Sequence, residues 1–96
     1  MSMSNTLSIA GFTVIVQSCW RDADNEIQAH IILVNQPGEP VFHEAAMCLF
    51  KEDRIDYEFD SLGKMLSDVN SNKFKSILET NQTKIRSKLK SLINNK

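Results

Sequence analysis

Four side chains in this chain could ligate a metal ion, or act together as a nucleophile and its base: Cys19, Cys48, His30 and His43. Both kinds of chemistry need spacings that bring such groups together, and the sequence contains no CxxC, HxxxH or HExxH pattern. Cys48 lies in the apolar run 45–50, which is typical of a small core residue. We therefore expect no metal site. Cys19 is the more accessible thiol, because a polar, turn-forming run follows it closely.

A second group of candidate ligands consists of Asp22, Asp24 and Glu26. Their alternate spacing imitates the start of a calcium-binding loop. The imitation ends at the sixth position, where Ile27 stands in place of the glycine that the bend requires. A solvated turn is the better interpretation of these acids.

Three further acids, Asp56, Glu58 and Asp60, share one face of a predicted strand. Paired carboxylates can perform acid–base chemistry such as glycoside hydrolysis, but alternating acids on an outer strand are usually its solvent side. The three glycines of the chain are too far apart to form a phosphate-cradling loop. We expect a protein that is not an enzyme and that uses no cofactor.

Charge is divided unevenly along the chain. The net charge is -1, but residues 1–71 sum to -7 and residues 72–96 sum to +6. An asymmetry of this size bears on the partners of a protein more than the net charge does.

Length and composition are those of one globular domain, with 96 residues of which 42% are apolar and 24% charged. We expect a single domain over residues 6–96, after a disordered N-terminus at residues 1–5. The longest apolar run, residues 45–50, is much shorter than the roughly 20 residues that cross a bilayer, and no signal peptide is visible. Two cysteines are too few for a disulfide framework, which fits a reducing compartment. The chain is therefore predicted to be cytoplasmic and to have no membrane partner.

The first half of the chain has strand patterns. Residues 6–18 are rich in β-branched residues on both faces of one extended strand, with Gly11 as a bulge. Residues 27–34 resume this character after a polar turn, so the two strands are predicted to form an antiparallel hairpin. Residues 41–51 fit either a buried strand or a helical stripe, and a helix at 41–50 stays open as an alternative. Residues 55–59 alternate strictly between apolar and acidic side chains, which indicates a strand. The fold class is predicted to be α+β, with an antiparallel meander of three or four strands over residues 6–60.

Helical patterns fill the rest of the chain. Asp60 or Ser61 can cap a short helix that extends to Val69, and residues 70–72 are expected to break and recap the chain. The final segment is either one longer helix or two helices joined near residues 79–83. Its apolar stripe consists of Phe74, Ile77, Leu78, Ile85, Leu89, Leu92 and Ile93.

The cations of this final segment flank the apolar stripe, where their long stems can cover a buried seam and bring ammonium groups to an acidic surface beside it. The stripe is therefore predicted to pack on the sheet or on a second subunit. An unbroken helix of roughly 35 Å would overhang a small domain and favour a homodimer, whereas a break near Asn81 would let one chain cover its own stripe.

These observations predict a small protein-interaction module of the inhibitor, immunity, chaperone or adaptor type. An acidic sheet surface would meet a basic protein partner, and its expected residues are Asp22, Asp24, Asp56, Glu58 and Asp60. The alternative is a nucleic-acid-binding protein that uses the basic C-terminal helix through Lys84, Arg86, Lys88 and Lys90. A ligand carrier or enzyme would require a deep pocket around Cys19, His30 or His43.

Overall fold

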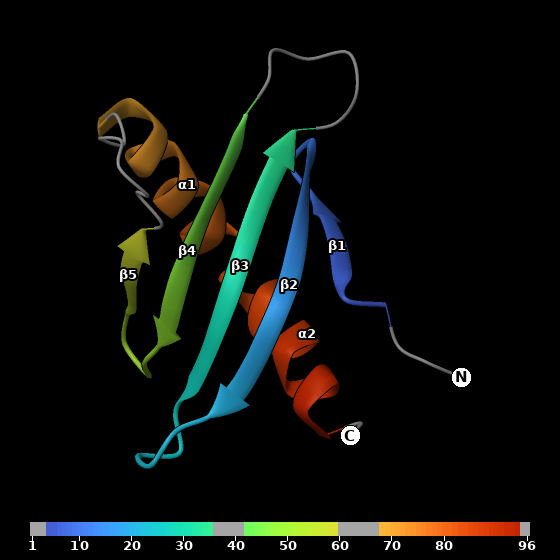
Figure 1. Ribbon diagram of the computed structural model, residues 1–96, viewed down its shortest axis with the longest axis vertical. Coiled ribbons are helices and arrows are strands. Elements are labelled where there is room, and N and C mark those ends of the chain that lie inside the picture. The colour runs from blue at the N-terminus through green and yellow to red at the C-terminus, as the bar shows by residue number, and fades with distance from the viewer. Residues whose placement is uncertain (1–3, 36–41, 60–67, 95–96) are drawn as a thin grey trace.

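The computed structural model of the chain describes residues 4–35, 42–59 and 68–94. One antiparallel sheet contains five strands in sequence order, followed by two helices (Figure 1). The strands are β1 (Thr6–Ile9), β2 (Phe12–Arg21), β3 (Ile27–Asn35), β4 (His43–Phe50) and β5 (Ile55–Phe59). The helices are α1 (Asp68–Thr80) and α2 (Gln82–Asn94). The predicted α+β meander is confirmed.

The sheet has one strand more than predicted, because residues 6–18 are not one continuous strand. β1 and β2 form a hairpin in which Ile9 pairs with Phe12 around a two-residue turn. The turn residues Ala10 and Gly11 have φ values of 50° and 81°, the backbone conformation of the tight turns that match the twist of a hairpin. The prediction of a bulge at Gly11 was wrong. The bulge of this sheet lies instead between Val16 and Ser18 of β2.

The open question of residues 41–50 is settled in favour of a strand. β4 pairs along its length with β3, from Val34 opposite His43 to Ile27 opposite Phe50. Its buried residues alternate with partly exposed ones, which is the period of a strand and not of a helix. The alternation predicted for residues 55–59 is likewise that of β5.

The start of the helical region differs from the prediction. Residues 70–72 do not break the chain but lie within α1. Val69, the last residue of the predicted short helix, is 75% exposed. Most of that predicted helix, residues 60–67, lies outside the described residues, as do residues 1–3 of the predicted disordered terminus.

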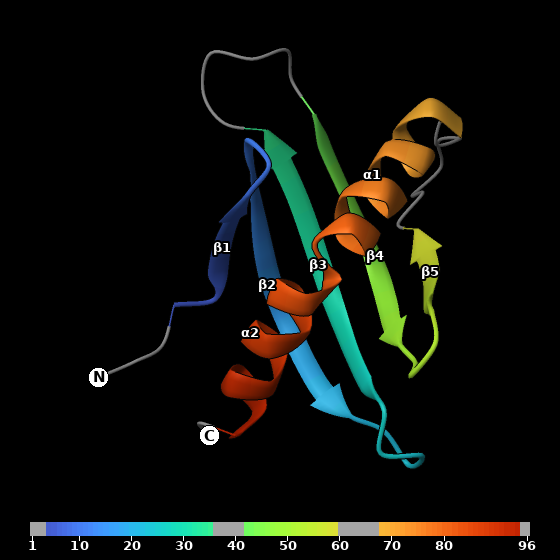
Figure 2. The same ribbon diagram turned by 180° about the vertical axis from the view of Figure 1, so that it is seen from behind.

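The long C-terminal segment is two helices joined at Asn81. The Asn81 side-chain amide donates to the Ile77 carbonyl oxygen at 2.8 Å, and the Asn81 backbone N–H donates to the same oxygen at 3.2 Å. The helices follow each other diagonally across one face of the sheet, with α1 beside β4 and α2 over β2 (Figure 2). No helix in the described part of the chain is long and apolar enough to cross a membrane.

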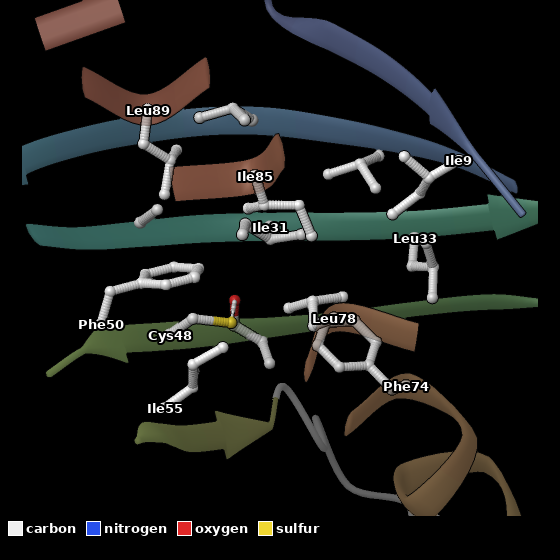
Figure 3. Close-up of a cluster of buried hydrophobic side chains, with 14 of the residues drawn as sticks. Ile9, Ile31, Leu33, Cys48, Phe50, Ile55, Phe74, Leu78, Ile85 and Leu89 are labelled. Atoms are coloured by element: carbon white, nitrogen blue, oxygen red, sulfur yellow. Dashed lines mark hydrogen bonds between the residues drawn. The ribbon is translucent and has the colours of Figure 1, made fainter. Parts of the chain in front are cut away.

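The core lies between the helices and one face of the sheet (Figure 3). Ile31 and Leu33 of β3 are completely buried there, in one cluster with Leu78, Ile85 and Leu89 of the helices. The expectation that the apolar stripe of the cationic segment is buried is confirmed within a single chain. Within the described residues the segment is two helices and not one unbroken helix, so the overhang that would favour a homodimer is not formed, and the stripe lies against the sheet of its own chain.

Aromatic rings fasten α1 to the edge strand β5. Phe74 meets Phe59 and Tyr57 edge to face, with ring centroids 5.2 Å and 6.1 Å apart. Such arrangements are favoured by the ring quadrupoles. The Tyr57 hydroxyl also donates to Glu79 of α1 at 3.0 Å.

Candidate interaction surface: the uncovered face of the sheet

Both helices lie on the same face of the sheet, so among the described segments nothing covers the opposite face (Figures 1 and 2). Residues directly opposite each other on paired strands point to the same face. The strand register therefore identifies the side chains of the uncovered face. One row runs from Ser18 through His30 and Met47 to Glu58, and the next begins at Trp20 of β2.

The uncovered face is apolar along the middle of the sheet. Seven side chains contribute to this surface, which we call the apolar strip: Ile15, Trp20, Ile32, Val34, Ala45, Met47 and Leu49. Trp20 is 37% exposed, and the other six are partly exposed. Antiparallel sheets with one solvated face usually alternate between apolar and polar residues. β3 does not follow that rule, because its run Ile31-Ile32-Leu33-Val34 is apolar on both faces.

Sequence reasoning did not assign the apolar strip to function. Its signal was nevertheless present, because apolar residues on both faces indicate a strand that is covered on both sides. Residues 6–18 have apolar residues on both faces in the sequence, and residues 31–34 have the same pattern.

Acidic side chains border the apolar strip on β5. Asp56 lies opposite Leu49 and Glu58 lies opposite Met47, and both acids are exposed. Arg54 forms an ion pair with Asp56, with 3.1 Å between Nε and Oδ1. Two of the predicted partner-binding residues thus stand beside the apolar strip. Asp60, the third acid of that pattern, lies outside the described residues.

A hollow of about 390 Å³ lies where the acidic border meets the apolar strip. It is lined by Ser18, His30, Met47, Glu58 and Phe59. The bulge of β2 places the consecutive residues Gln17 and Ser18 beside His30, whose Nδ1 lies in hydrogen-bonding contact with Oε1 of Gln17. The hollow offers a partner side chain an imidazole and a carboxylate at the edge of an apolar surface.

The predicted partner-binding residues Asp22 and Asp24 lie in the turn between β2 and β3. One oxygen of the Asp22 carboxylate accepts hydrogen bonds from the backbone N–H groups of Asp24 and Glu26, each at 3.0 Å. The other oxygen accepts from Nε2 of Gln28, also at 3.0 Å. The hydrogen bonds from Gln28 and from the Glu26 backbone lower the pKa of Asp22. Asp22 therefore shapes the turn, while Asp24 is exposed at its tip.

The carboxylate oxygens of Asp22, Asp24 and Glu26 lie within 4.8 Å of one another. Asp22 is held by the turn as described, and Glu26 forms an ion pair with Lys51 at 3.4 Å. Asp22 and Glu26 thus have partners within the protein, and the cluster is a hydrogen-bonded turn. This agrees with the absence of the glycine that a calcium-binding loop requires.

The four candidates for thiol and imidazole chemistry are divided between the two faces. Cys48 is buried on the helix-covered face, where desolvation raises the pKa of its thiol to about 12. Cys19 is opposite Ala29 on that same face. His30 and His43 lie opposite Met47 and Val34 on the uncovered face. The sheet itself separates the thiols from the imidazoles.

The candidate nucleic-acid-binding residues do not form one surface. Arg86 is directed at the sheet, where Nη2 donates to the Lys51 carbonyl oxygen at 2.6 Å and the guanidinium lies 5.4 Å from the centroid of the Phe50 ring. Lys84 and Lys88 border a groove between α2 and β1, and Lys90 is exposed elsewhere on α2.

The sequence predicts that the cations beside the apolar stripe reach an acidic surface. Two lysines of α1 lie over aromatic rings instead. The Lys73 ammonium is 5.2 Å from the centroids of both Phe12 and Phe42, and that of Lys75 is 5.7 Å from the centroid of Tyr57. In such cation–π contacts the lysine side chain covers the aromatic ring at the edge of the core, while the ammonium group stays close to solvent.

No family model matches the chain, and no curated protein or solved structure matches it either.

Proposed function

We propose that the protein is a small, non-enzymatic interaction module that binds a protein partner on the uncovered face of its sheet. The observation that carries this proposal is the apolar strip, which lies on the face opposite the helices and contains the partly exposed Trp20, Ile32 and Leu49. Exposed apolar surface rimmed by polar residues is characteristic of interaction sites. Aromatic residues such as Trp20 are frequent anchors in such sites.

The charges around the apolar strip favour a partner with a basic rim. No strand residue of this face is a lysine or arginine, as far as the described strands extend, whereas Asp56 and Glu58 border it. Lys51 and Arg54, in the turn between β4 and β5, are each engaged in an ion pair with an acid. An apolar partner surface flanked by lysine or arginine would complement this arrangement. Two thiols and no disulfide fit a reducing location, and we propose the cytoplasm.

The proposal is tested by replacing Ile32 and Leu49 together by threonine. Threonine suits a strand but removes most of the apolar surface, so the fold should survive while the docking surface is lost. Affinity capture from native lysate would identify proteins retained by the wild type and not by the variant. Each retained protein would then be purified and titrated against the wild type and the variant, with Lys90→Gln, an exposed position on α2 remote from the apolar strip, as the control.

The acidic border is tested separately by Asp56→Asn with Glu58→Gln, two isosteric changes at exposed positions. We expect slower association and a weaker dependence of the dissociation constant on salt, since rim charges mainly steer encounter. Partners that bind the threonine variant as tightly as the wild type would overturn the proposed site. The proposed site would also be overturned if the wild type sedimented as a dimer and the threonine variant as a monomer. The apolar strip would then bind a second copy of the chain.

The nucleic-acid alternative is not favoured, because Arg86 is committed to the sheet. A truncation after Asn72 would remove the basic segment, but it cannot test nucleic-acid binding. The same truncation removes four buried core residues: Phe74, Leu78, Ile85 and Leu89. Replacing Lys84, Lys88 and Lys90 by glutamine leaves the core intact and is the appropriate variant.

A further inference from the structure

A groove of about 540 Å³ is lined by residues of β1 and α2. These two elements lie on the side of the molecule remote from β5 (Figure 2). Its floor includes Leu7, a partly exposed residue of β1. Its wall is one side of α2, with three hydroxyl-bearing residues spaced four apart and the two lysines between them: Thr83, Lys84, Ser87, Lys88 and Ser91. The groove combines an apolar floor with a polar, cationic wall.

β1 borders this groove as an edge strand of the sheet. Ile9 and Phe12 flank the two-residue turn, and the Val16 N–H donates to the Asn5 carbonyl oxygen at 2.8 Å. Hydrogen-bonded pairs alternate along an antiparallel ladder, so Asn5, Leu7 and Ile9 use their backbone groups toward β2. The N–H and C=O of Ser8 therefore point outward, away from β2. An outward-facing strand edge of this kind can pair with an added strand.

The groove is electrostatically positive. α2 contains no acidic residue in its span of Gln82–Asn94, and neither does β1. Within the described residues, Lys84 and Lys88 form no ion pair, whereas Lys51 and Arg54 do. The two groove lysines are one helical turn apart, about 6 Å along the axis. Alternate side chains of an extended strand are separated by a similar distance, about 6.6 Å.

We propose that this groove is a second binding site, which takes an extended acidic peptide segment as an additional strand beside β1. The peptide backbone would pair with Ser8. Carboxylates at alternate positions of the peptide would meet Lys84 and Lys88, and an intervening apolar contact would be made with Leu7. The site is independent of the apolar strip, because α2 and the uncovered face lie on opposite sides of the sheet.

The test uses the full chain and a fluorescent peptide in which glutamate alternates with valine, with binding followed by polarisation at low salt. We expect saturable binding that the double change Lys84→Gln, Lys88→Gln weakens about five- to tenfold, the effect of two exposed ion pairs. Lys90→Gln, on the same helix but outside the groove, is the matched control. Ile32→Thr with Leu49→Thr should leave peptide binding unchanged, which separates this site from the proposed docking face.

The backbone pairing is tested from both sides. Ser8→Pro removes the outward N–H without touching a bond to β2, and should weaken peptide binding by about two- to tenfold. Methylating alternate backbone nitrogens of the peptide tests the same hydrogen bonds with the unaltered protein, in case the proline disturbs β1. Three results would overturn the proposal: no saturable peptide binding, insensitivity to both backbone changes, or tighter binding of a single-stranded oligonucleotide of equal charge.

Discussion

Arg86 of α2 donates a 2.6 Å hydrogen bond from Nη2 to the carbonyl oxygen of Lys51, a residue 35 positions earlier in the turn after β4. Its Nε donates to Gln82 at 3.1 Å, and its guanidinium lies over Phe50. Arg86, one of the cations of the basic segment, thus joins α2 to the turn between β4 and β5.

Arg86→Lys should therefore lower the free energy of unfolding by about 1–3 kcal/mol, because an ammonium cannot reproduce the two directed N–H donors and the planar contact with Phe50. Urea unfolding followed by circular dichroism measures this difference. Lys90→Ala, at an exposed position, should change it by less than about 0.5 kcal/mol. Equal effects of the two substitutions would contradict a structural role for Arg86.

Leu89→Ala should lower the free energy of unfolding by about 2–5 kcal/mol, because Leu89 is completely buried and its truncation leaves a cavity. Leu89→Asp should be more severe, since it places a charge without a partner in the core. Both are measured by urea unfolding, with Ser91→Ala on the exposed side of the same helix as the control. A Leu89→Asp protein as stable as the wild type would show that α2 does not pack on the sheet.

Tyr57 is the only tyrosine of the chain, so tyrosinate absorbance reports on it alone. Burial, followed by the hydrogen bond to Glu79 and the negative charge of Glu79, raises the pKa of Tyr57 above its ordinary value of 10.0. The stabilisation linked to the neutral phenol is fully present below pH 10.0 and is lost as the pH rises toward the higher folded pKa. In a spectrophotometric titration, the folded protein should ionise at higher pH than the urea-unfolded chain.

Glu79→Gln provides the control for this titration. It should move the tyrosine midpoint back toward its ordinary pKa without abolishing the shift, because burial is its largest cause. A folded protein that titrates like the unfolded chain would mean that Tyr57 is neither buried nor bonded to Glu79.

Cys48 should be inert toward thiol reagents in the folded protein, because the thiolate is the reactive form and burial raises the pKa of this thiol to about 12. The Cys19→Ser variant isolates Cys48, and its labelling rate is measured across a urea gradient. We expect labelling to follow global unfolding. Rapid labelling in the absence of urea would place Cys48 outside the core, and the Cys48→Ser variant reports on Cys19 in the same assay.

The sequence by itself determined the elements whose period is unambiguous. The strict alternation in residues 55–59 is compatible only with a strand, and the stripe from Phe74 to Ile93 only with helical structure that buries one side. Local sequence could not settle residues 41–50, because a short apolar run has the same composition in a buried strand and in a helix. It also missed the turn at Ala10 and Gly11, because alanine seldom adopts a positive φ.

Only the tertiary structure decided which surfaces remain exposed and which charges are used internally. Ile32 and Leu33 are neighbours of similar type, and whether each is covered depends on which face of β3 the distant helices occupy. Arg86 and Lys90 are likewise both cations of one helix, yet Arg86 meets the Lys51 carbonyl while Lys90 meets solvent. Burial and hydrogen bonding between distant segments are properties of the packed chain, whereas periodicity is a property of neighbouring residues alone.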